Sequence, residues 1–355
     1  MTRDIKLKLT WLFFGIIVII DYLQLSLNVY CKNDVNNINF ELNEENEYDW
    51  YGRVVVIGDI HGDLKSLLAC LYLSGITDRN FDWIANNTML IQLGDIVDRG
   101  PHAFQIYKLF NKLRNQAPLY NSKFIGLIGN HEIMNICGQL QYVTSEDIET
   151  YGGRDNRIFE WSDKGFIGKY IKTLKLVVRV NDSLFVHAGL HPKYAKLGID
   201  TLEKKSKYLL NDIYKYCDDY TSLFFLEDGP LWTREISLGN DEISCNLVNS
   251  TLSTLNLNRM VIGHTIQLDN RINIKCNNRL YLIDTGLSEA IYGKPCLLEL
   301  LYNSKSTTDK EKTYNSPYSI NELIVRENED KLKYIHVNNV LLSKNETLTN
   351  NKDEL

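Results

Sequence analysis

Five short motifs along the chain place aspartate, histidine or asparagine beside glycine, a combination that can bind metal ions. Each motif follows an apolar segment typical of a β-strand. The motifs are Gly58-Asp59-Ile60-His61-Gly62, Gly94-Asp95-Ile96-Val97-Asp98-Arg99-Gly100, Gly129-Asn130-His131-Glu132, Val186-His187-Ala188-Gly189 and Gly263-His264-Thr265. Because ligands bind beyond the carboxyl ends of strands in open α/β sheets, these side chains are expected to lie together.

The ligand types predict two divalent metal ions, manganese or the pair iron and zinc. Carboxylate, imidazole and amide oxygen suit these ions, and the five motifs contain no cysteine. Asp95 is the candidate bridge, because a carboxylate has two oxygens. We expect one ion to be held by Asp59, His61 and Asp95, and the other by Asp95, Asn130, His187 and His264. In such sites the ions lie roughly 3.5 to 4 Å apart and share a hydroxide nucleophile.

Taken singly, each motif has a simpler explanation. A Gly-Asp pair after a strand usually makes a turn or caps a helix, and a lone histidine there is more often structural than a ligand. Five such motifs in order, each after an apolar strand, favour the metal site over these explanations.

Strand-loop-helix units must position the first three motifs. Strands are expected at 53–57, 89–93 and 124–128, and helices at 64–74, 104–113 and just after Glu132. Three such units predict a mainly parallel sheet. Further strands, expected to form a second sheet packed on the first, are predicted at 174–180, 183–187, 260–262, 279–283 and 297–301. The segment 145–170 reads as a helical cap insertion able to cover a site.

The order of the motifs resembles the phosphoprotein phosphatases, whose pattern is GDxHG, GDxVDRG, GNHE, a later HxG and a last GH. The resemblance extends over about 53–288, and three further segments are similar to the Shewanella-like branch, namely 230–235, 263–267 and 284–288. It implies an α/β, calcineurin-like metallophosphoesterase fold with two mixed β-sheets in a sandwich flanked by helices. It also implies a metal-dependent phosphatase acting on phosphotyrosine or phosphoserine/threonine in a phosphoprotein substrate.

The resemblance carries roles over to individual residues. His131 matches the general acid that protonates the leaving oxygen, and Asp98 the carboxylate that orients and charges it. Phosphate binding is expected from Arg99, Arg234 and Asn130, with Arg154 and Arg157 of the insertion as further candidates. The chain departs from serine/threonine members at Val186-His187-Ala188-Gly189, where they carry His-Gly-Gly, and it shows no counterpart of their Ser-Ala-Pro-Asn-Tyr-Cys loop.

Two alternatives stay open at this point. Dinucleoside polyphosphate hydrolases and other small-molecule phosphoesterases share the first motifs, although Val97-Asp98-Arg99 fits the protein phosphatases better. A lumenal metal-binding protein without catalysis is the other alternative, and the intact His131 argues against it.

The two ends of the chain predict a place in the secretory pathway. Residues 1–31 read as a signal peptide or a signal anchor, so membrane attachment through an uncleaved anchor is an alternative. Residues 32–50 are expected to form a disordered spacer before the metallophosphatase domain at 51–338. A flexible tail is expected at 339–355, and it ends in Lys-Asp-Glu-Leu. This ending predicts the KDEL receptor as a partner and the endoplasmic-reticulum lumen as the location. Together with the Asn- and Lys-rich insertions, it suggests a protist member of the Shewanella-like branch.

The net charge, the cysteines and the glycosylation sequons give further expectations about partners and modification. The net charge of -6 predicts no nucleic-acid partner. Cys245 and Cys276 are the first candidates for a disulfide, and Cys70 is expected to be a buried free thiol. Four glycosylation sequons begin at Asn86, Asn181, Asn249 and Asn345.

Overall fold

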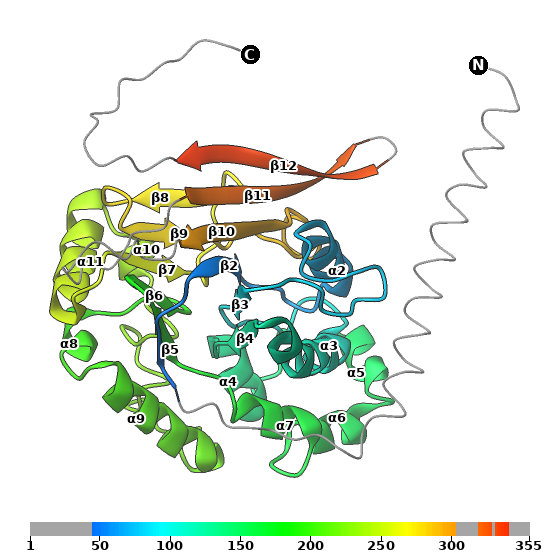
Figure 1. The fold of residues 1–355 in the computed structure, drawn as a ribbon. Coiled ribbons are helices and arrows are strands. Elements are labelled where there is room, and N and C mark those ends of the chain that lie inside the picture. The colour runs from blue at the N-terminus through cyan, green and yellow to red at the C-terminus, as the bar shows by residue number, and fades with distance from the viewer. Residues whose placement is uncertain (1–44, 303–318, 329–330, 341–355) are drawn as a thin grey trace, which may run out of the picture.

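Two six-stranded β-sheets pack face to face in the computed structural model, which describes residues 45–302, 319–328 and 331–340 (Figure 1). The first sheet has the order β12-β11-β10-β2-β3-β4. Its strands are β12 (Lys331–Val340), β11 (Ser319–Asn328), β10 (Cys296–Tyr302), β2 (Gly52–Ile57), β3 (Thr88–Gln92) and β4 (Lys123–Gly126). The strands β2, β3 and β4 run parallel, as the strand-loop-helix units predict, and β10 pairs antiparallel with β2.

The second sheet has the order β1-β5-β6-β7-β9-β8 and is also mixed. Its strands are β1 (Glu47–Tyr48), β5 (Val177–Val180), β6 (Ser183–Val186), β7 (Arg259–Ile262), β9 (Leu280–Leu282) and β8 (Asn273–Lys275). The strands β6, β7 and β9 are parallel to one another, so the loops after them emerge at the same edge. The predicted sandwich of two mixed sheets is therefore confirmed. The strand predicted at 297–301 is β10, which pairs with β2 in the first sheet and does not join the second as expected.

Helices cover both outer faces of the sandwich (Figure 1). Beside β2 to β4 lie α2 (Leu64–Leu73), α3 (Ala103–Gln116), the 3-10 helix η1 (Ala117–Tyr120) and α4 (Asn130–Ile136). The insertion consists of α5 (Ser145–Thr150), α6 (Arg154–Trp161) and α7 (Phe166–Ile171). The remaining helices are α8 (Pro192–Ala195), α9 (Ile199–Asn211), η2 (Ile213–Lys215), α10 (Glu235–Leu238) and α11 (Asp241–Leu255).

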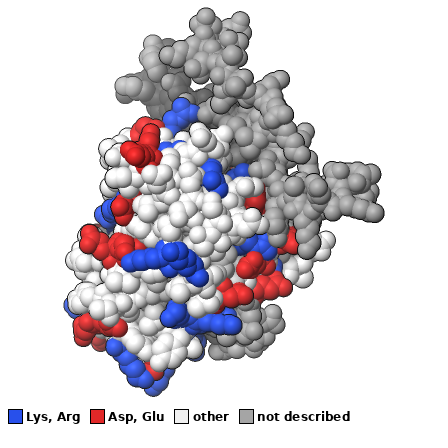
Figure 2. All heavy atoms as spheres, turned by 90° about the vertical axis from the view of Figure 1, so that its left-hand side faces the viewer, with Lys and Arg blue, Asp and Glu red and all other residues white. Residues whose placement is uncertain are grey.

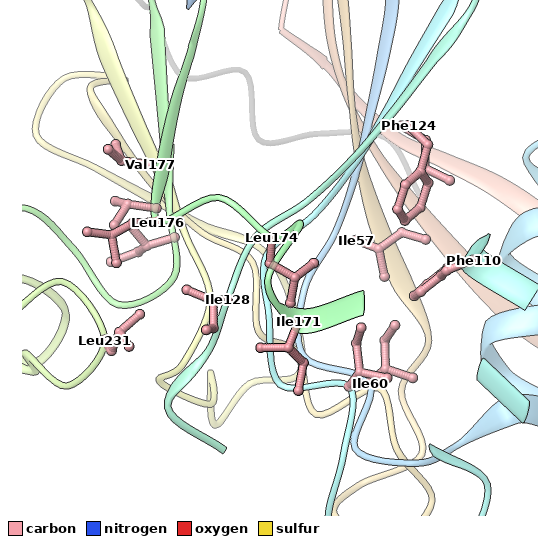
Figure 3. Packing of buried hydrophobic residues seen from close by; sticks show 14 of the residues in the cluster. Ile57, Ile60, Phe110, Phe124, Ile128, Ile171, Leu174, Leu176, Val177 and Leu231 are labelled. Atoms are coloured by element: carbon pink, nitrogen blue, oxygen red, sulfur yellow. The ribbon is translucent and has the colours of Figure 1, made fainter. Parts of the chain in front are cut away.

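Alternating side chains of the central strands divide the apolar core into two layers. Val54 and Val56 of β2 pack between the sheets, where they join Phe185 of the second sheet. Their neighbours Val55 and Ile57 point to the outer layer under the helices, part of which Figure 3 shows. Because β2 is buried on both faces, its unbroken apolar sequence is that of a central strand.

Figure 2 shows the face of the molecule that carries α8, α9 and α11. Acidic and basic side chains are interspersed over it, so both signs of charge share this face.

Three boundaries differ from the sequence-based prediction. Residues 45–50 were assigned to a disordered spacer, but Glu47 and Tyr48 pair with β5 and Tyr48 is buried. A two-residue edge strand has too few positions to show a periodicity, which explains the error. The strands β11 and β12 were not predicted, and β12 carries the domain to Val340 rather than 338. The predicted leader and most of the predicted spacer and tail lie outside the described residues.

Two disulfides cross-link the described part of the chain. Cys245–Cys276 confirms the prediction and joins α11 to the turn between β8 and β9. Cys137–Cys217 was not predicted, because its partners lie 80 residues apart in sequence. Cys70 is a buried free thiol, as expected.

No helix among the described residues is long and apolar enough to cross a membrane.

Glu203 of α9 joins this helix to the start of β5. One of its carboxylate oxygens, Oε1, accepts hydrogen bonds of 2.7 Å from the backbone N–H groups of Leu176 and Val177. Burial raises the pKa of Glu203 from 4.5 to about 7, although the two N–H groups and Lys175 act in the opposite direction. The folded protein therefore retains a proton that the unfolded chain releases between these two pH values.

We expect Glu203→Gln to change how stability depends on pH. Glutamine keeps the accepting Oε1 and has no proton to lose, whereas wild-type Glu203 contributes least to stability above its folded pKa. The shift from 4.5 to about 7 corresponds to about 3 kcal/mol. Urea unfolding of metal-free protein measures the free energy of unfolding of both proteins. Between pH 4.5 and pH 8, this free energy should rise for the variant relative to the wild type by up to about 3 kcal/mol. If the free energies of unfolding of the two proteins depended on pH in the same way, the raised pKa of Glu203 would be contradicted.

Candidate metal centre and active site

Three histidines of the predicted site are oriented by backbone carbonyl groups. His61 Nδ1 lies 3.0 Å from the oxygen of Val97, His187 Nδ1 2.9 Å from that of Leu93, and His264 Nε2 3.2 Å from that of Trp232. Because a carbonyl oxygen only accepts, each facing nitrogen carries a proton. The second nitrogen of each ring keeps its lone pair for a metal ion, which is the usual arrangement of ligating histidines.

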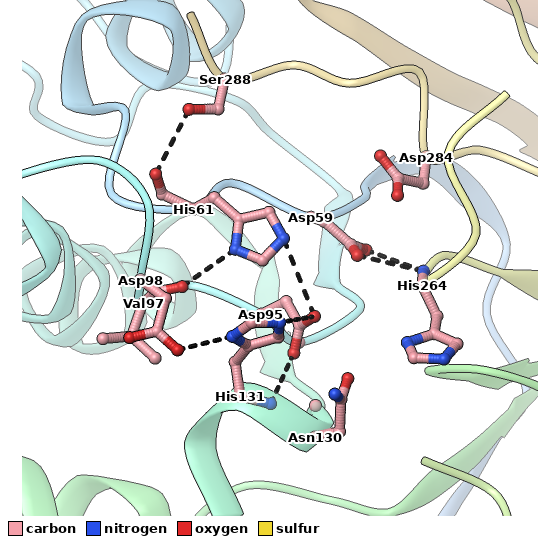
Figure 4. A network of polar contacts seen from close by, with 12 residues as sticks. Asp59, His61, Asp95, Val97, Asp98, Asn130, His131, His264, Asp284 and Ser288 are labelled. Atoms are coloured by element: carbon pink, nitrogen blue, oxygen red, sulfur yellow. Dashed lines mark hydrogen bonds and ion pairs between the residues drawn. The ribbon is translucent and has the colours of Figure 1, made fainter. Parts of the chain in front are cut away.

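Asp95 is shared by two clusters of possible ligands. One contains His61, Asp95 and His131, the other Asp95, His187 and His264, and the ligand atoms within each lie within 4.8 Å of one another. Asp95 Oδ2 is 3.9 Å from His61 Nε2 and 3.5 Å from His187 Nε2, while Oδ1 accepts from the backbone N–H of His131 at 3.0 Å (Figure 4). The position of Asp95 therefore agrees with its predicted bridging role.

The contact between Asn130 and His187 indicates that a metal ion fits between these two side chains. Asn130 Oδ1 lies 3.0 Å from His187 Nε2. Burial lowers the pKa of His187 to about 3, and its single proton is on Nδ1, which faces Leu93. Two lone pairs thus face each other without a proton between them, an arrangement that a shared metal ion would satisfy. Burial likewise lowers the pKa of His61 and of His264, so both rings are neutral and able to bind a metal.

Three carboxyl groups are buried together beside these rings. Burial raises the pKa of Asp95 to about 7 and that of Asp284 to about 6. The pKa of Asp59 is raised further by burial and by the charges of Asp284 and Asp95. Divalent cations would compensate this concentration of negative charge. Asp284 belongs to none of the five motifs, although it stands in the segment 284–288 that supports the resemblance.

Asp59 lies outside both clusters. Both of its carboxylate oxygens accept from the backbone N–H of His264 at 3.1 Å, and Figure 4 shows the side chain pointing toward that residue. A Cβ atom on Gly263 would approach Asp59 Oδ1 to 2.3 Å, so glycine is required there. Its role as a metal ligand stays a prediction.

Glu132 ties the loops of the second and third motifs together. Its carboxylate accepts from the backbone N–H groups of Gly129, Asp95 and Ile96 at 2.8 to 2.9 Å and from the Tyr107 hydroxyl at 3.0 Å. This fully buried residue belongs to the Gly129-Asn130-His131-Glu132 motif, but sequence alone assigned it no function. It places Asp95 and His131 relative to each other.

His131 faces Asp98 with one ring nitrogen and Asp95 with the other. Its Nδ1 lies 2.5 Å from Asp98 Oδ2, and its Nε2 lies 3.9 Å from Asp95 Oδ2. Burial acts against a charge on this ring, but Asp95 and Asp98 outweigh it and raise the pKa of His131. An imidazolium held in this way can donate a proton from Nε2.

The predicted phosphate-binding arginines occupy different surroundings. Arg99 is exposed, with its guanidinium 4.9 Å from the ring centroid of Tyr142. Arg234 is also exposed, and its Nη1 donates to the His264 carbonyl at 3.2 Å and to the Thr265 hydroxyl at 3.1 Å. Arg154 is exposed at the start of α6. Arg157 is buried and bound to Asp147 and Asn135, so it does not face substrate as expected.

Residues 52–268 match the calcineurin-like phosphoesterase family, which is more than half of the chain and contains every predicted metal ligand. Shewanella-like protein phosphatase 1 of Plasmodium berghei is 34% identical over 261 residues, which cover 70% of this chain and 72% of that protein. The chain belongs to the calcineurin-like phosphoesterases, among the Shewanella-like protein phosphatases.

Two further comparisons agree with this membership. Shewanella-like protein phosphatase 2 of Arabidopsis thaliana is 28% identical over 314 residues, covering 71% of this chain and 76% of that protein. The crystal structure of a cold-active protein-tyrosine phosphatase from a psychrophilic Shewanella species superposes with a TM-score of 0.66 at 22% identity, covering 82% of each chain. The latter likeness establishes the fold of this calcineurin-like chain.

We expect Asp95→Asn to remove both metal ions of this phosphoesterase. Asparagine can keep its oxygen for the His131 N–H, and it then directs an NH₂ group, which cannot bind a metal ion, toward His61 and His187. Metal content per chain, measured by mass spectrometry after dialysis, should fall at both positions while the protein stays folded. Loss of a single ion would show that Asp95 does not bridge.

Proposed function

We propose that this chain is a metal-dependent protein phosphatase that hydrolyses phosphate monoesters. One divalent ion would be held by Asp59, His61 and Asp95, and the other by Asp95, Asn130, His187 and His264. The observation that carries the proposal is the position of His131. Its Nδ1 faces Asp98 at 2.5 Å, while Nε2 points to the same Asp95 oxygen that His61 and His187 approach. A proton donor thus lies next to a candidate dinuclear centre, as hydrolysis of a phosphate ester requires.

Manganese, or iron with zinc, fits the oxygen and nitrogen ligands. When bound, the ions would neutralise the phosphate oxygens and activate the attacking water. His131 donates a proton from Nε2 to the leaving oxygen, and Asp98 stabilises the imidazolium before that transfer. Arg99 and Arg234 supply guanidinium groups that can hold phosphate oxygens in a bidentate manner. Asn130 contributes its amide beside His187.

The substrate is a phosphoprotein carrying phosphotyrosine or phosphoserine/threonine. The names of the relatives from Plasmodium berghei and Arabidopsis thaliana support a protein substrate, since both are called protein phosphatases. Tyr142, which is 41% exposed, lies 5.2 Å from the His131 ring and offers an aromatic wall beside the acid. An aromatic wall would favour a phenyl ring, so phosphotyrosine is the first candidate.

The test is phosphate release by the purified full chain, metal-stripped and reloaded with manganese, zinc or iron. Matched phosphotyrosine and phosphoserine peptides and a diadenosine polyphosphate serve as substrates. We expect metal-dependent release from the peptides, loss of release in Asp59→Asn, and turnover about 100-fold lower in His131→Asn with both metals retained. Preferred cleavage of the polyphosphate would favour the small-molecule alternative. A folded, metal-loaded protein that releases no phosphate would instead be a metal-binding protein.

The same proposal places the protein in the lumen of the endoplasmic reticulum, retained by the KDEL receptor, with membrane attachment if the leader stays uncleaved. The two disulfides support an oxidising compartment. The sequon asparagines Asn86 and Asn249 are exposed and open to glycosylation. Asn181 is not, because it is buried and its amide bonds both backbone groups of Trp50 at 2.8 and 2.6 Å.

Expression of the full chain in a eukaryotic cell tests this location. We expect a gel shift on treatment with endoglycosidase H, reduced stepwise by Asn86→Gln and Asn249→Gln. Removal of residues 352–355 should release the protein into the medium if the leader is cleaved. A chain without glycans and with reduced cysteines would contradict a lumenal location.

A further inference from the structure

Hydrogen bonds connect the His131–Asp98 pair with the helical insertion. Asp98 Oδ2 contacts His131 Nδ1, and its other oxygen, Oδ1, accepts from Asn135 Nδ2 at 2.9 Å. Asn135 Oδ1 in turn accepts from Arg157 Nη2 of α6 at 2.7 Å. Arg157 Nε then donates to Asp147 Oδ2 of α5 at 2.9 Å. These contacts occupy both oxygens of Asp98, so its carboxylate is held at two points.

Only one orientation of the Asn135 amide satisfies these neighbours. A guanidinium only donates and an ionised carboxylate only accepts, so the oxygen must face Arg157 and the NH₂ group must face Asp98. The same NH₂ group donates to the His131 carbonyl at 3.0 Å, one helical turn earlier in α4. Asn135 therefore separates Arg157 from Asp98. A guanidinium in direct contact would compensate the Asp98 charge, which is needed beside the imidazolium.

All four side chains joined by these hydrogen bonds are buried away from water. Asp98 is 1% exposed, Asn135 and Arg157 4% each, and Asp147 0%. The Arg157 guanidinium also lies 5.4 Å from the ring centroid of Tyr151 and 5.1 Å from that of Trp161. Hydrogen bonds in such a low-dielectric interior are strong and directional, so they can fix a side chain.

The turn that carries Asp98 needs such support. Asp98 and Arg99 have φ angles of 74° and 68°, two consecutive non-glycine residues in the left-handed region. Backbone of this kind persists only where its surroundings determine it. The Asn135 amide holds the first of these residues by its side chain, and the Tyr142 carbonyl accepts from the Arg99 N–H at 2.9 Å.

We propose that Asn135, Arg157 and Asp147 are positioning residues, which hold Asp98 and thereby aim His131 at the leaving oxygen. In this arrangement, buried side chains of α5 and α6 hold Asp98 in place through Asn135. This role is separate from any covering of the site by the insertion. The inference rests on the proposed phosphatase activity. It assigns the buried Arg157 a function in catalysis although that residue does not touch the substrate.

The experiment compares two substrates that depend differently on the acid. A phosphotyrosine or phosphoserine peptide, whichever the wild type cleaves faster, has a poor leaving group and needs protonation, whereas p-nitrophenyl phosphate has a good one and needs little. We expect Asn135→Leu and Arg157→Lys to lower kcat/KM for the phosphopeptide about tenfold or more beyond any loss on p-nitrophenyl phosphate. Leucine removes the contact to Asp98 at similar size, and lysine keeps a charge for Asp147 without the two-sided geometry of arginine.

Arg259→Lys is the matched control. Arg259 is 2% exposed and pairs with buried Asp182 at 2.9 Å, but it lies on β7, outside the contacts of the acid. This variant should affect both substrates equally. In a His131→Asn background, Asn135→Leu and Arg157→Lys should have no further selective effect, because the group they position is absent.

The outcomes separate the two claims. Wild-type protein that hydrolyses neither substrate with any metal would overturn the proposed function and this inference with it. An active wild type whose variants lose both substrates equally, or lose metal ions together with activity, would overturn the inference alone. If Asn135→Leu fails to fold, Arg157→Lys decides by the same comparison, with metal content and thermal unfolding measured beside activity.

Discussion

The centre of this structure depends on the two oxygens of Asp95. One is held by the backbone N–H of His131, and the other faces the imidazoles of His61 and His187. A buried carboxylate in this position is costly without cations, since desolvation disfavours its charge. The proposed metal ions would relieve that cost. The two sheets around the site hold Asp95 close to the imidazoles of His61 and His187.

Both sheets contribute to the geometry. Asp59 and Asp95 follow β2 and β3 of one sheet, while His187 and His264 follow β6 and β7 of the other. The relative position of the two groups is therefore set by the apolar layer between the sheets, in which Val56 and Phe185 take part. Close packing of this layer limits relative movement of the sheets and keeps the ligands in place. The N–H of His264 on Asp59 adds a direct polar contact between the two groups.

Charge is distributed unevenly around His131. Asp95 and Asp98 lie on two sides of the ring and favour its protonated form, whereas the predicted ligands His61 and His187 are neutral. Arg157 is a buried cation of the insertion, and the neutral amide of Asn135 separates it from Asp98. This separation lets the Arg157 charge support the position of His131, the proposed acid, without compensating the Asp98 charge that favours the imidazolium.

Sequence alone determined the strands β2, β3 and β4 and the five motifs after the strands. These features are local: apolar runs and glycine-flanked polar residues report their own conformation. The proximity of His187 and His264 follows from the parallel pairing of β6 with β7, because parallel neighbours end at one edge. The approach of Asp95 from the other sheet depends on how the two sheets pack. The predicted helices of the insertion were likewise visible in sequence.

Only the tertiary structure decided the direction in which Arg157 points, the pairing of Cys137 with Cys217, and the strand at Glu47–Tyr48. It also showed that Glu132 joins two loops and that Asp284 belongs to the carboxylate cluster. A charged side chain on a short helix looks the same in sequence whether it faces solvent or an interior partner. Which of the two occurs depends on contacts between segments distant in sequence, and packing alone establishes those contacts.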